Sequence, residues 1–307
     1  MPPAILIHGP TASGKTALAI ALAKEFRGEI VNADAMQVYK DLRVLTARPD
    51  DEELSQATHH MFGHVDGVER YSTGRWLEDV QAQIKDIQAR GAMPILAGGT
   101  GLYLSSLVYG LSVIPDVPEE IKQQARDKAY ADRSAAHAEL SEVDPETASR
   151  ITPADGQRLA RALEVFYATG KPLSSFQTPA DPILKPGEWL GIALTPRRAS
   201  LYARIEARFD AMLETGAPDE ARALWERGLP RDLPIMRAHG MPGFCDYFED
   251  SVSLEDAITR AKRDTRRYAK RQFTWIANQF PEWVRLPSED LDIRTDVVKA
   301  LVDNFAC

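Results

Sequence analysis

Short apolar runs alternate with longer amphipathic segments along most of the chain. In the segments between the runs, apolar residues such as Trp76, Val80 and Ile84 recur at helical spacing. Strands that alternate with helices favour a mostly parallel sheet with helices on both faces, so we predict an α/β fold. The predicted strands are residues 4–7, 29–32, 94–97 and 189–194.

The strand pattern disappears between residues 115 and 187, where prolines separate charged, alanine-rich stretches. We predict an all-helical insertion domain, 115–187, which divides the α/β core into 1–114 and 188–307. Beyond it, long amphipathic helices are expected at residues 200–213, 218–227 and 254–278.

A glycine-rich segment follows the first predicted strand and precedes a predicted helix. It fits the P-loop pattern G-x-x-x-x-G-K-[ST], and its residues are Gly9, Pro10, Thr11, Ala12, Ser13, Gly14, Lys15 and Thr16. In this setting backbone N–H groups and the helix dipole bind phosphate, Lys15 adds charge and Thr16 offers a hydroxyl to Mg²⁺. The motif predicts a diphosphate or triphosphate ligand, as in ATP-binding proteins, without specifying a nucleotide.

Two other strand ends carry possible chemistry. Asp34 follows the second predicted strand and could accept a proton from a nucleophile, or could equally be an ordinary turn residue. The third strand ends in glycines and Thr100, where hydrolytic P-loop enzymes usually place an acid. Because ligands bind beyond the carboxyl ends of parallel strands, we expect these residues to share the P-loop cleft.

Composition narrows the class of protein. The chain has 307 residues, a net charge of −8 and 2 cysteines, without metal-binding or disulfide spacing. No apolar run is long enough for a membrane span, and no signal peptide is expected. These features suit a cytoplasmic protein, which we expect to be a monomer.

Residues 260–271 form a basic cluster in this acidic chain. With almost no acids nearby in sequence, pairing within the helix cannot neutralise it, so a phosphate-rich partner is as good an interpretation as a solvated surface.

His59, His60 and His64 lack the nearby carboxylate or cysteine ligands that a metal site needs, and are expected to be structural or to position substrate. Arg204 and Arg208 lie one turn apart and could hold a diphosphate, although a surface face is the usual alternative.

Several motifs occur in one order along nearly the whole chain: GPTASGKT at 9–16, DAMQVY at 34–39, TARP at 46–49, GGTGLYL at 98–104, DGQRLARALEV at 155–165, LYARIEARFDAML at 201–213 and TRRYAKRQFTW at 265–275. Together they resemble the bacterial tRNA dimethylallyltransferases, also called tRNA isopentenyltransferases. The resemblance implies transfer of a dimethylallyl group from dimethylallyl diphosphate to N6 of adenosine 37 in tRNA.

The resemblance also implies roles for individual residues. Asp34 would be the general base, Thr100 would bind near the transferring centre, and Lys15, Thr16 and Arg208 would hold the diphosphate and Mg²⁺. The helical insertion would contact the anticodon stem-loop. The tRNA-binding residues would be Asp34, Ala35, Met36, Gln37, Gln157, Arg158, Leu159, Ala160, Arg161, Arg237, His239, Gly240, Lys270, Arg271 and Gln272.

The chain departs from the family pattern in places. Ala35 replaces a usual serine, and residues 238–243, AHGMPG, replace A-I-G-Y-[KR]-[EQ]. Three rival interpretations remain open: a P-loop small-molecule kinase, a prenyltransferase for free adenine nucleotides, and an RNA-binding protein with a structural nucleotide site.

Overall fold

The structure is a computed structural model that describes residues 3–178 and 180–305. The chain divides into two compact units. The larger consists of residues up to Val108 and from Ile183 onward, and the smaller is Tyr109–Pro182. The sequence pattern placed the corresponding boundaries at 115 and 187, several residues later at both ends.

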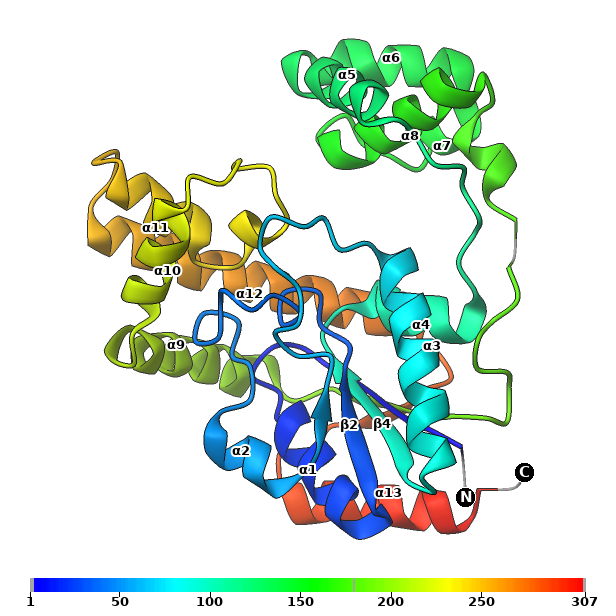
Figure 1. Ribbon diagram of the computed structural model, residues 1–307, viewed down its shortest axis with the longest axis vertical. Coiled ribbons are helices and arrows are strands. Elements are labelled where there is room, and N and C mark those ends of the chain that lie inside the picture. The colour runs from blue at the N-terminus through cyan, green and yellow to red at the C-terminus, as the bar shows by residue number, and fades with distance from the viewer. Residues whose placement is uncertain (1–2, 179, 306–307) are drawn as a thin grey trace. The chain divides into compact units, whose positions relative to one another are not determined.

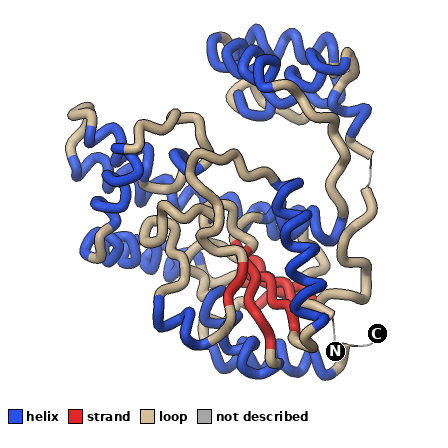
Figure 2. The backbone as a smooth tube through the Cα atoms, viewed as in Figure 1, coloured by secondary structure: helices blue, strands red, loops and turns tan. Residues whose placement is uncertain are grey.

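The larger unit is built on a six-stranded sheet in which every pair of neighbours is parallel. Figure 2 shows strands of this sheet in red. The strand order is β3-β2-β4-β1-β5-β6, which confirms the predicted α/β class. The sequence pattern missed the two shortest strands, one at each edge. The bounds are β1 Ile5–His8, β2 Gly28–Asn32, β3 His59–His60, β4 Met93–Gly98, β5 Leu190–Leu194 and β6 Val284–Leu286.

Helices cover both faces of the sheet, as the alternation of strands and helices predicted. The bounds in this unit are α1 Lys15–Phe26, α2 Asp51–Gln56, α3 Thr73–Ala89, α4 Gly101–Tyr109, α9 Arg198–Glu214, α10 Ala217–Glu226, η2 Ile235–Arg237, α11 Met241–Phe248, α12 Leu254–Gln279 and α13 Leu291–Asp303 (Figure 1). Among the described residues, none of the helices combines the length and apolar composition needed to cross a bilayer.

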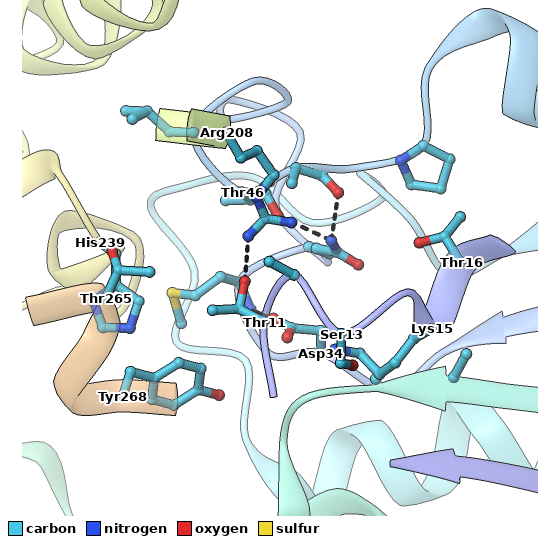
Figure 3. Close-up of a pocket in the computed structure, with 18 of the residues that line it drawn as sticks. Thr11, Ser13, Lys15, Thr16, Asp34, Thr46, Arg208, His239, Thr265 and Tyr268 are labelled. Carbon is cyan, nitrogen blue, oxygen red and sulfur yellow. Dashed lines mark hydrogen bonds between the residues drawn. The ribbon is translucent and has the colours of Figure 1, made fainter. Parts of the chain in front are cut away.

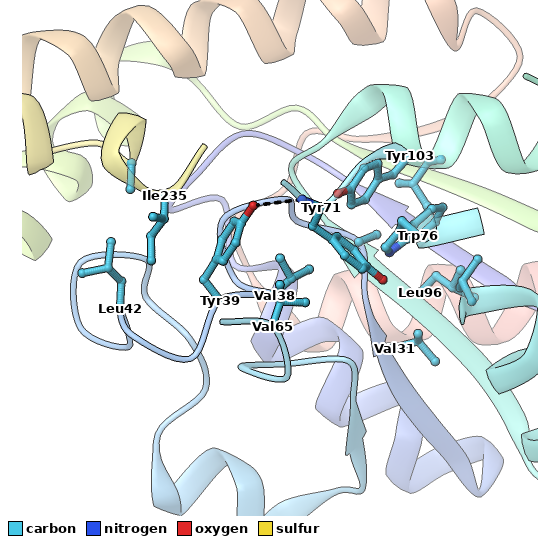
Figure 4. Close-up of a cluster of buried hydrophobic side chains, with 14 of the residues drawn as sticks. Val31, Val38, Tyr39, Leu42, Val65, Tyr71, Trp76, Leu96, Tyr103 and Ile235 are labelled. Atoms are coloured by element: carbon cyan, nitrogen blue, oxygen red, sulfur yellow. Dashed lines mark hydrogen bonds between the residues drawn. The ribbon is translucent and has the colours of Figure 1, made fainter. Parts of the chain in front are cut away.

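The side chains of β1 show how the strand pattern makes two cores. Ile5 and Ile7 pack with α1 and α13, whereas Leu6 points to the opposite face, because successive strand residues alternate. The Leu6 face holds the larger cluster, in which Trp76 stacks on Tyr103 at 4.4 Å between ring centroids (Figure 4). Both faces of the sheet are therefore buried, as parallel sheets require.

The regular elements of the smaller unit are all helices among its described residues. Alanines at buried positions of α5, such as Ala125 and Ala129, let it pack closely against α8, which contributes Leu159 and Leu163. The buried carboxylate of Asp144 caps α7 and accepts the Ser174 N–H at 2.9 Å. Its elements are α5 Glu119–Ala131, α6 Arg133–Val143, α7 Pro145–Ala148, α8 Gly156–Thr169 and η1 Leu173–Phe176.

The chain leaves the larger unit and returns to it at one point. The N–H groups of Ile183 and Leu184 both donate to the carbonyl of Leu107, at 3.0 and 3.1 Å. The sheet strands β4 and β5 are thus connected through α4, the helical unit and this paired return.

Candidate functional site

One cavity of about 760 Å³ lies in the larger unit, beyond the carboxyl ends of the strands. The P-loop, Asp34 and Thr100 all line it, so the structure brings together the three strand ends that the sequence analysis singled out. Arg208 from α9 and Tyr268 from α12 complete its wall (Figure 3).

The P-loop backbone is supported from outside the loop. Arg204 Nε donates to the Ala12 carbonyl at 3.0 Å, and Arg294 Nη1 donates to the Ser13 carbonyl at 2.8 Å. Gly14 has a positive φ of 89° at the start of α1, a conformation that glycine adopts without strain. Two arginines from distant helices therefore hold the loop in its phosphate-binding shape.

Lys15 occupies the position of the motif lysine. Its Nζ donates to the carbonyls of Gly9 and Pro10, both at 3.0 Å. Burial lowers the pKa of Lys15 to about 8, against the opposing effect of Asp34, so the ammonium is poorly solvated. A bound diphosphate would supply the missing negative charge.

Beside the P-loop, His8 ends β1 and is fully buried, with Nδ1 3.2 Å from the Gly98 carbonyl. Burial lowers its pKa to about 3 and Lys15 acts in the same direction, so the ring is neutral at physiological pH. A neutral imidazole next to Lys15 adds no further positive charge to this part of the site.

Asp34 lies at the cavity in a turn that orients its backbone. Its N–H donates to Asn32 Oδ1 at 2.8 Å, and its own Oδ1 accepts the Met36 N–H at 3.0 Å. The Thr100 hydroxyl accepts the N–H of Ala35 at 2.9 Å. Thr100 therefore connects the end of β4 to the turn that carries the carboxylate.

Arg208 of α9 binds the P-loop through a side-chain hydrogen bond. Its guanidinium donates to the Thr11 hydroxyl, and burial lowers its pKa while Asp34 counteracts the effect. The Arg208 guanidinium and the Lys15 ammonium thus line the same cavity. The Asp34 carboxylate acts to raise the pKa of both groups.

The cavity rim at residues 43–47 is held by two side chains. Gln37 Nε2 donates to the carbonyls of Thr46 and Ala47, at 2.9 and 2.7 Å. The Glu220 carboxylate accepts the backbone N–H groups of three successive residues, 43 to 45. The amide nitrogen of Gln37 is therefore used within the protein, whereas its assigned role in tRNA binding remains a prediction.

The basic helix α12 differs from its sequence-based interpretation. Acids from neighbouring helices pair with several of its bases: Arg260 with Asp246, Lys262 with Asp210 and Arg266 with Glu206. The interpretation of the cluster as one without neutralising acids is therefore wrong for these three bases, whose partners are distant in sequence. Pairing within the helix also occurs, because Asp264 forms ion pairs with Arg260 and Arg267. Across the described ranges, no ion pair forms at Lys270 or Arg271, and both are exposed.

Gln272, expected among the tRNA-binding residues, points inward instead. It is 4% exposed, and its amide binds Thr11 of the P-loop and Gly99 at the end of β4.

Two other expected tRNA-binding residues, Arg237 and Arg271, line both the main cavity and an adjoining hollow of about 260 Å³. His239 packs against Tyr268 at 4.7 Å, while Gly240 is a buried N-cap with a φ of 102°.

Within residues 238–243, which depart from the family pattern, Gly243 has a packing reason. A Cβ at Gly243 would stand 2.9 Å from the Ala257 carbonyl, so α11 approaches α12 too closely for a larger residue. The hollow beside it is lined by Pro242 and by Arg260 and Arg267 of α12. Arg237 of η2 and Asp264 of α12 also line this hollow, so its charged groups come from both elements.

The remaining expected tRNA-binding residues belong to α8 of the helical unit. Leu159 and Ala160 are buried in that unit's core, so their side chains cannot reach a ligand. Gln157 and Arg158 are exposed, and Arg161 pairs with Glu164.

His59 and His60 form the edge strand β3. His60 pairs with Glu29 at 2.5 Å, and His59 binds the carbonyl of Ala57. Among the described residues no cluster of three or more His, Cys, Asp or Glu could hold a metal ion.

Sequence reasoning missed Arg294 as a P-loop support, Tyr268 as a cavity residue and His8 at the end of β1. The only available signal for His8 was a polar residue at the end of an apolar strand. Arg294 is joined to the P-loop across 281 residues of sequence, for which no local pattern exists.

Comparison with known proteins adds independent information. The family model described as IPP transferase matches residues 37–279, and one described as Isopentenyl transferase matches residues 2–66. A tRNA dimethylallyltransferase of Hyphomonas neptunium is 52% identical, with 98% of this chain and 96% of the relative covered. One from Azorhizobium caulinodans is 47% identical over 97% of this chain and 96% of the relative.

Solved structures agree. A tRNA isopentenylpyrophosphate transferase from Bacillus halodurans is 34% identical, covers 97% of this chain and 95% of its own, and superposes with a TM-score of 0.69. A eukaryotic dimethylallyltransferase, described as acting on tRNA, is 30% identical with a TM-score of 0.79, over 97% of this chain and 77% of its own.

Proposed function

The chain belongs to the IPP transferase family, and on that premise we propose that it transfers a dimethylallyl group from dimethylallyl diphosphate to N6 of adenosine 37 in tRNA. The products are N6-(dimethylallyl)adenosine and diphosphate. The observation that supports this proposal is the shared cavity, which the P-loop and Asp34 both line.

The P-loop and two cations serve the leaving group. As the bond between the allylic carbon and the diphosphate oxygen breaks, negative charge develops on the diphosphate. Lys15 and Arg208 face this charge in a poorly solvated site, where fixed cations stabilise a transition state most strongly.

Asp34 serves the nucleophile. The N6 amine of adenine is weak, so a carboxylate that accepts its proton as the new N–C bond forms lowers the barrier. Thr100 holds the adjoining turn through Ala35, which keeps Asp34 directed at the cavity. The apolar wall, with Phe209 and Met212, limits access of water to the allylic carbon.

We propose Mg²⁺ as the cofactor, held by the Thr16 hydroxyl. Thr16 lines the cavity next to Lys15 (Figure 3), and one hydroxyl donor fits an ion that binds mainly phosphate oxygens and water. When bound, the ion would neutralise charge on the diphosphate.

The RNA side of the proposal concerns Arg237, Lys270 and Arg271. All three are exposed, and two of them line the cavity, so they suit phosphates that flank an extruded adenosine. Because tRNA is the proposed substrate, we propose further that the chain acts in the cytoplasm, as a monomer.

The test mixes the protein with labelled dimethylallyl diphosphate and either total tRNA or AMP. Label in tRNA alone, on adenosine 37, is the expected result. Label in AMP alone would indicate a prenyltransferase for free nucleotides. Label in neither acceptor, with phosphate transfer in a parallel assay that contains ATP, would indicate a kinase.

A further inference from the structure

The Gln272 side chain lies between the two halves of the site. Its Oε1 accepts the Thr11 N–H at 3.0 Å, while its Nε2 donates to the Gly99 carbonyl at 2.9 Å and lies 3.5 Å from the Gly9 carbonyl. One N–H donor on one side and two carbonyl acceptors on the other define the orientation of the amide. Gln272 therefore joins the P-loop to the end of β4.

The fit around this amide is close. A Cβ at Gly99 would stand only 2.3 Å from Gln272 Nε2, so the backbone of β4 approaches the amide as only glycine allows. The hydroxyl of Tyr268, one helical turn earlier on α12, donates to the same Gly99 carbonyl at 3.2 Å.

The Gln272 amide therefore forms a bridge between the P-loop and the end of β4, and each end of this bridge contacts a residue that binds a group assigned to the reaction. Thr11 also accepts a hydrogen bond from Arg208, on the side of the diphosphate. Gly99 precedes Thr100, which binds Ala35 beside Asp34, on the side of the nucleophile. The bridge thus sets the spacing between the cations and the carboxylate.

We propose that Gln272 is a positioning residue: its amide fixes the distance between the P-loop and the Gly99–Thr100 turn, and with it the alignment of diphosphate and general base. The inference rests on the proposed function. It replaces the role in RNA binding that the family resemblance implied, because both polar groups of Gln272 are already bonded inside the protein.

Gln272→Leu removes the bridge and keeps similar bulk. Because a displacement of about 1 Å can cost about 10² in rate, we expect kcat at saturating substrates to fall roughly 10- to 100-fold. The Kd for tRNA should stay within about twofold, since no RNA contact is lost.

Gln272→Glu gives a sharper readout. The protonated acid can reproduce both hydrogen bonds, whereas the carboxylate has no donor for Gly99. Burial, the two carbonyls and Asp34 favour the acid, and Lys15 and Arg208 favour the carboxylate. Tyr268 and Arg271 also face this region. Whatever the pKa of the introduced carboxyl group, only its protonated form has an O–H that can donate to the Gly99 carbonyl.

We therefore expect the kcat ratio of Gln272→Glu to wild type to rise as the pH falls from about 8 to about 5.5. The ratio for Gln272→Leu should not change with pH. The matched control is Gln279→Glu, at an exposed position of the same helix, whose ratio should stay near one.

Each alternative outcome is distinct. A kcat of Gln272→Leu close to that of wild type and a pH-independent ratio for Gln272→Glu, with lowered melting temperatures, would mean that the bridge is only structural and would overturn the proposal. Weakened tRNA binding with unchanged kcat would restore the RNA role. Absence of prenyl transfer by the wild-type chain would instead refute the proposed function.

Discussion

At the scale of single residues, Lys15 supplies the cation that binds the carbonyls of Gly9 and Pro10 in the P-loop. We predict that Lys15→Ala lowers kcat/KM for prenyl transfer by roughly 10²-fold or more, comparable to the loss of one transition-state donor. Lys24→Ala, on the exposed face of the same helix, is the control and should leave the rate unchanged. Steady-state assays of both variants decide the matter.

The pH profile gives a second check on Lys15. Its pKa of about 8 means that the free protein loses this charge as the pH rises through that value. In wild type, kcat/KM should therefore fall above about pH 8, and this limb should be missing in Lys15→Ala. An identical alkaline limb in the variant would assign it to another group.

We predict that Asp34→Asn keeps tRNA binding and lowers kcat by about 10²–10⁴, the usual range for a positioned acid or base. Asparagine retains the oxygen that accepts the Met36 N–H, so the turn should persist. Binding and single-turnover assays separate the two effects. Lost binding with normal turnover would make Asp34 a recognition residue.

The residues of this site differ in how far they could be predicted. The P-loop is one contiguous motif between a strand and a helix, so spacing and context identified it. Gln272 and His8 act through partners 261 and 90 residues away. Such contacts depend on the fold, and a local pattern carries no information about them.

At the scale of elements, the helical period predicted α12 well but not its surroundings. The four longest strands were found because each is a buried apolar run, whereas β3 and β6 are too short to form one. Acids on α9 and α11 pair with bases of α12, and Asp264 pairs with others within the helix, so a basic cluster in sequence is a partly neutralised surface in the structure.

Replacing Lys270 and Arg271 by Ala should weaken tRNA binding and reduce its salt dependence. We expect the log–log slope of affinity against salt to shrink by roughly 0.7–0.9 for each lost phosphate contact. The matched control is Lys262→Ala with Arg266→Ala, which removes bases paired with α9. The control should lower thermal stability and leave the slope unchanged; the reverse pattern would contradict the prediction.

At the scale of the whole molecule, the sequence predicted an α/β core interrupted by helices. The sequence did not predict the exact boundaries of the two units, because α4 continues to Tyr109 and the chain is irregular on both sides of the helices of the smaller unit. Proline and charge patterns mark where strands stop, whereas the edge of a compact unit depends on which residues pack together.

The paired return at Leu107 has a consequence for the folding of the larger unit. Because Ile183 and Leu184 bind the Leu107 carbonyl, the two ends of the excursion are adjacent within this unit. Residues 109–182 are then, for the larger unit, a long loop whose closure costs entropy. Each doubling of loop length costs about 0.6 kcal/mol.

Excision of residues 109–182, with a short Gly-Ser linker in their place, should therefore leave a core that unfolds cooperatively and is more stable by up to about 2 kcal/mol. Urea denaturation of both forms measures the difference. A core without a cooperative transition would show that the helices are needed to complete the fold. If the excised core does fold, the two parts of this enzyme are separable, and a lineage could exchange its helical unit while it keeps its chemistry.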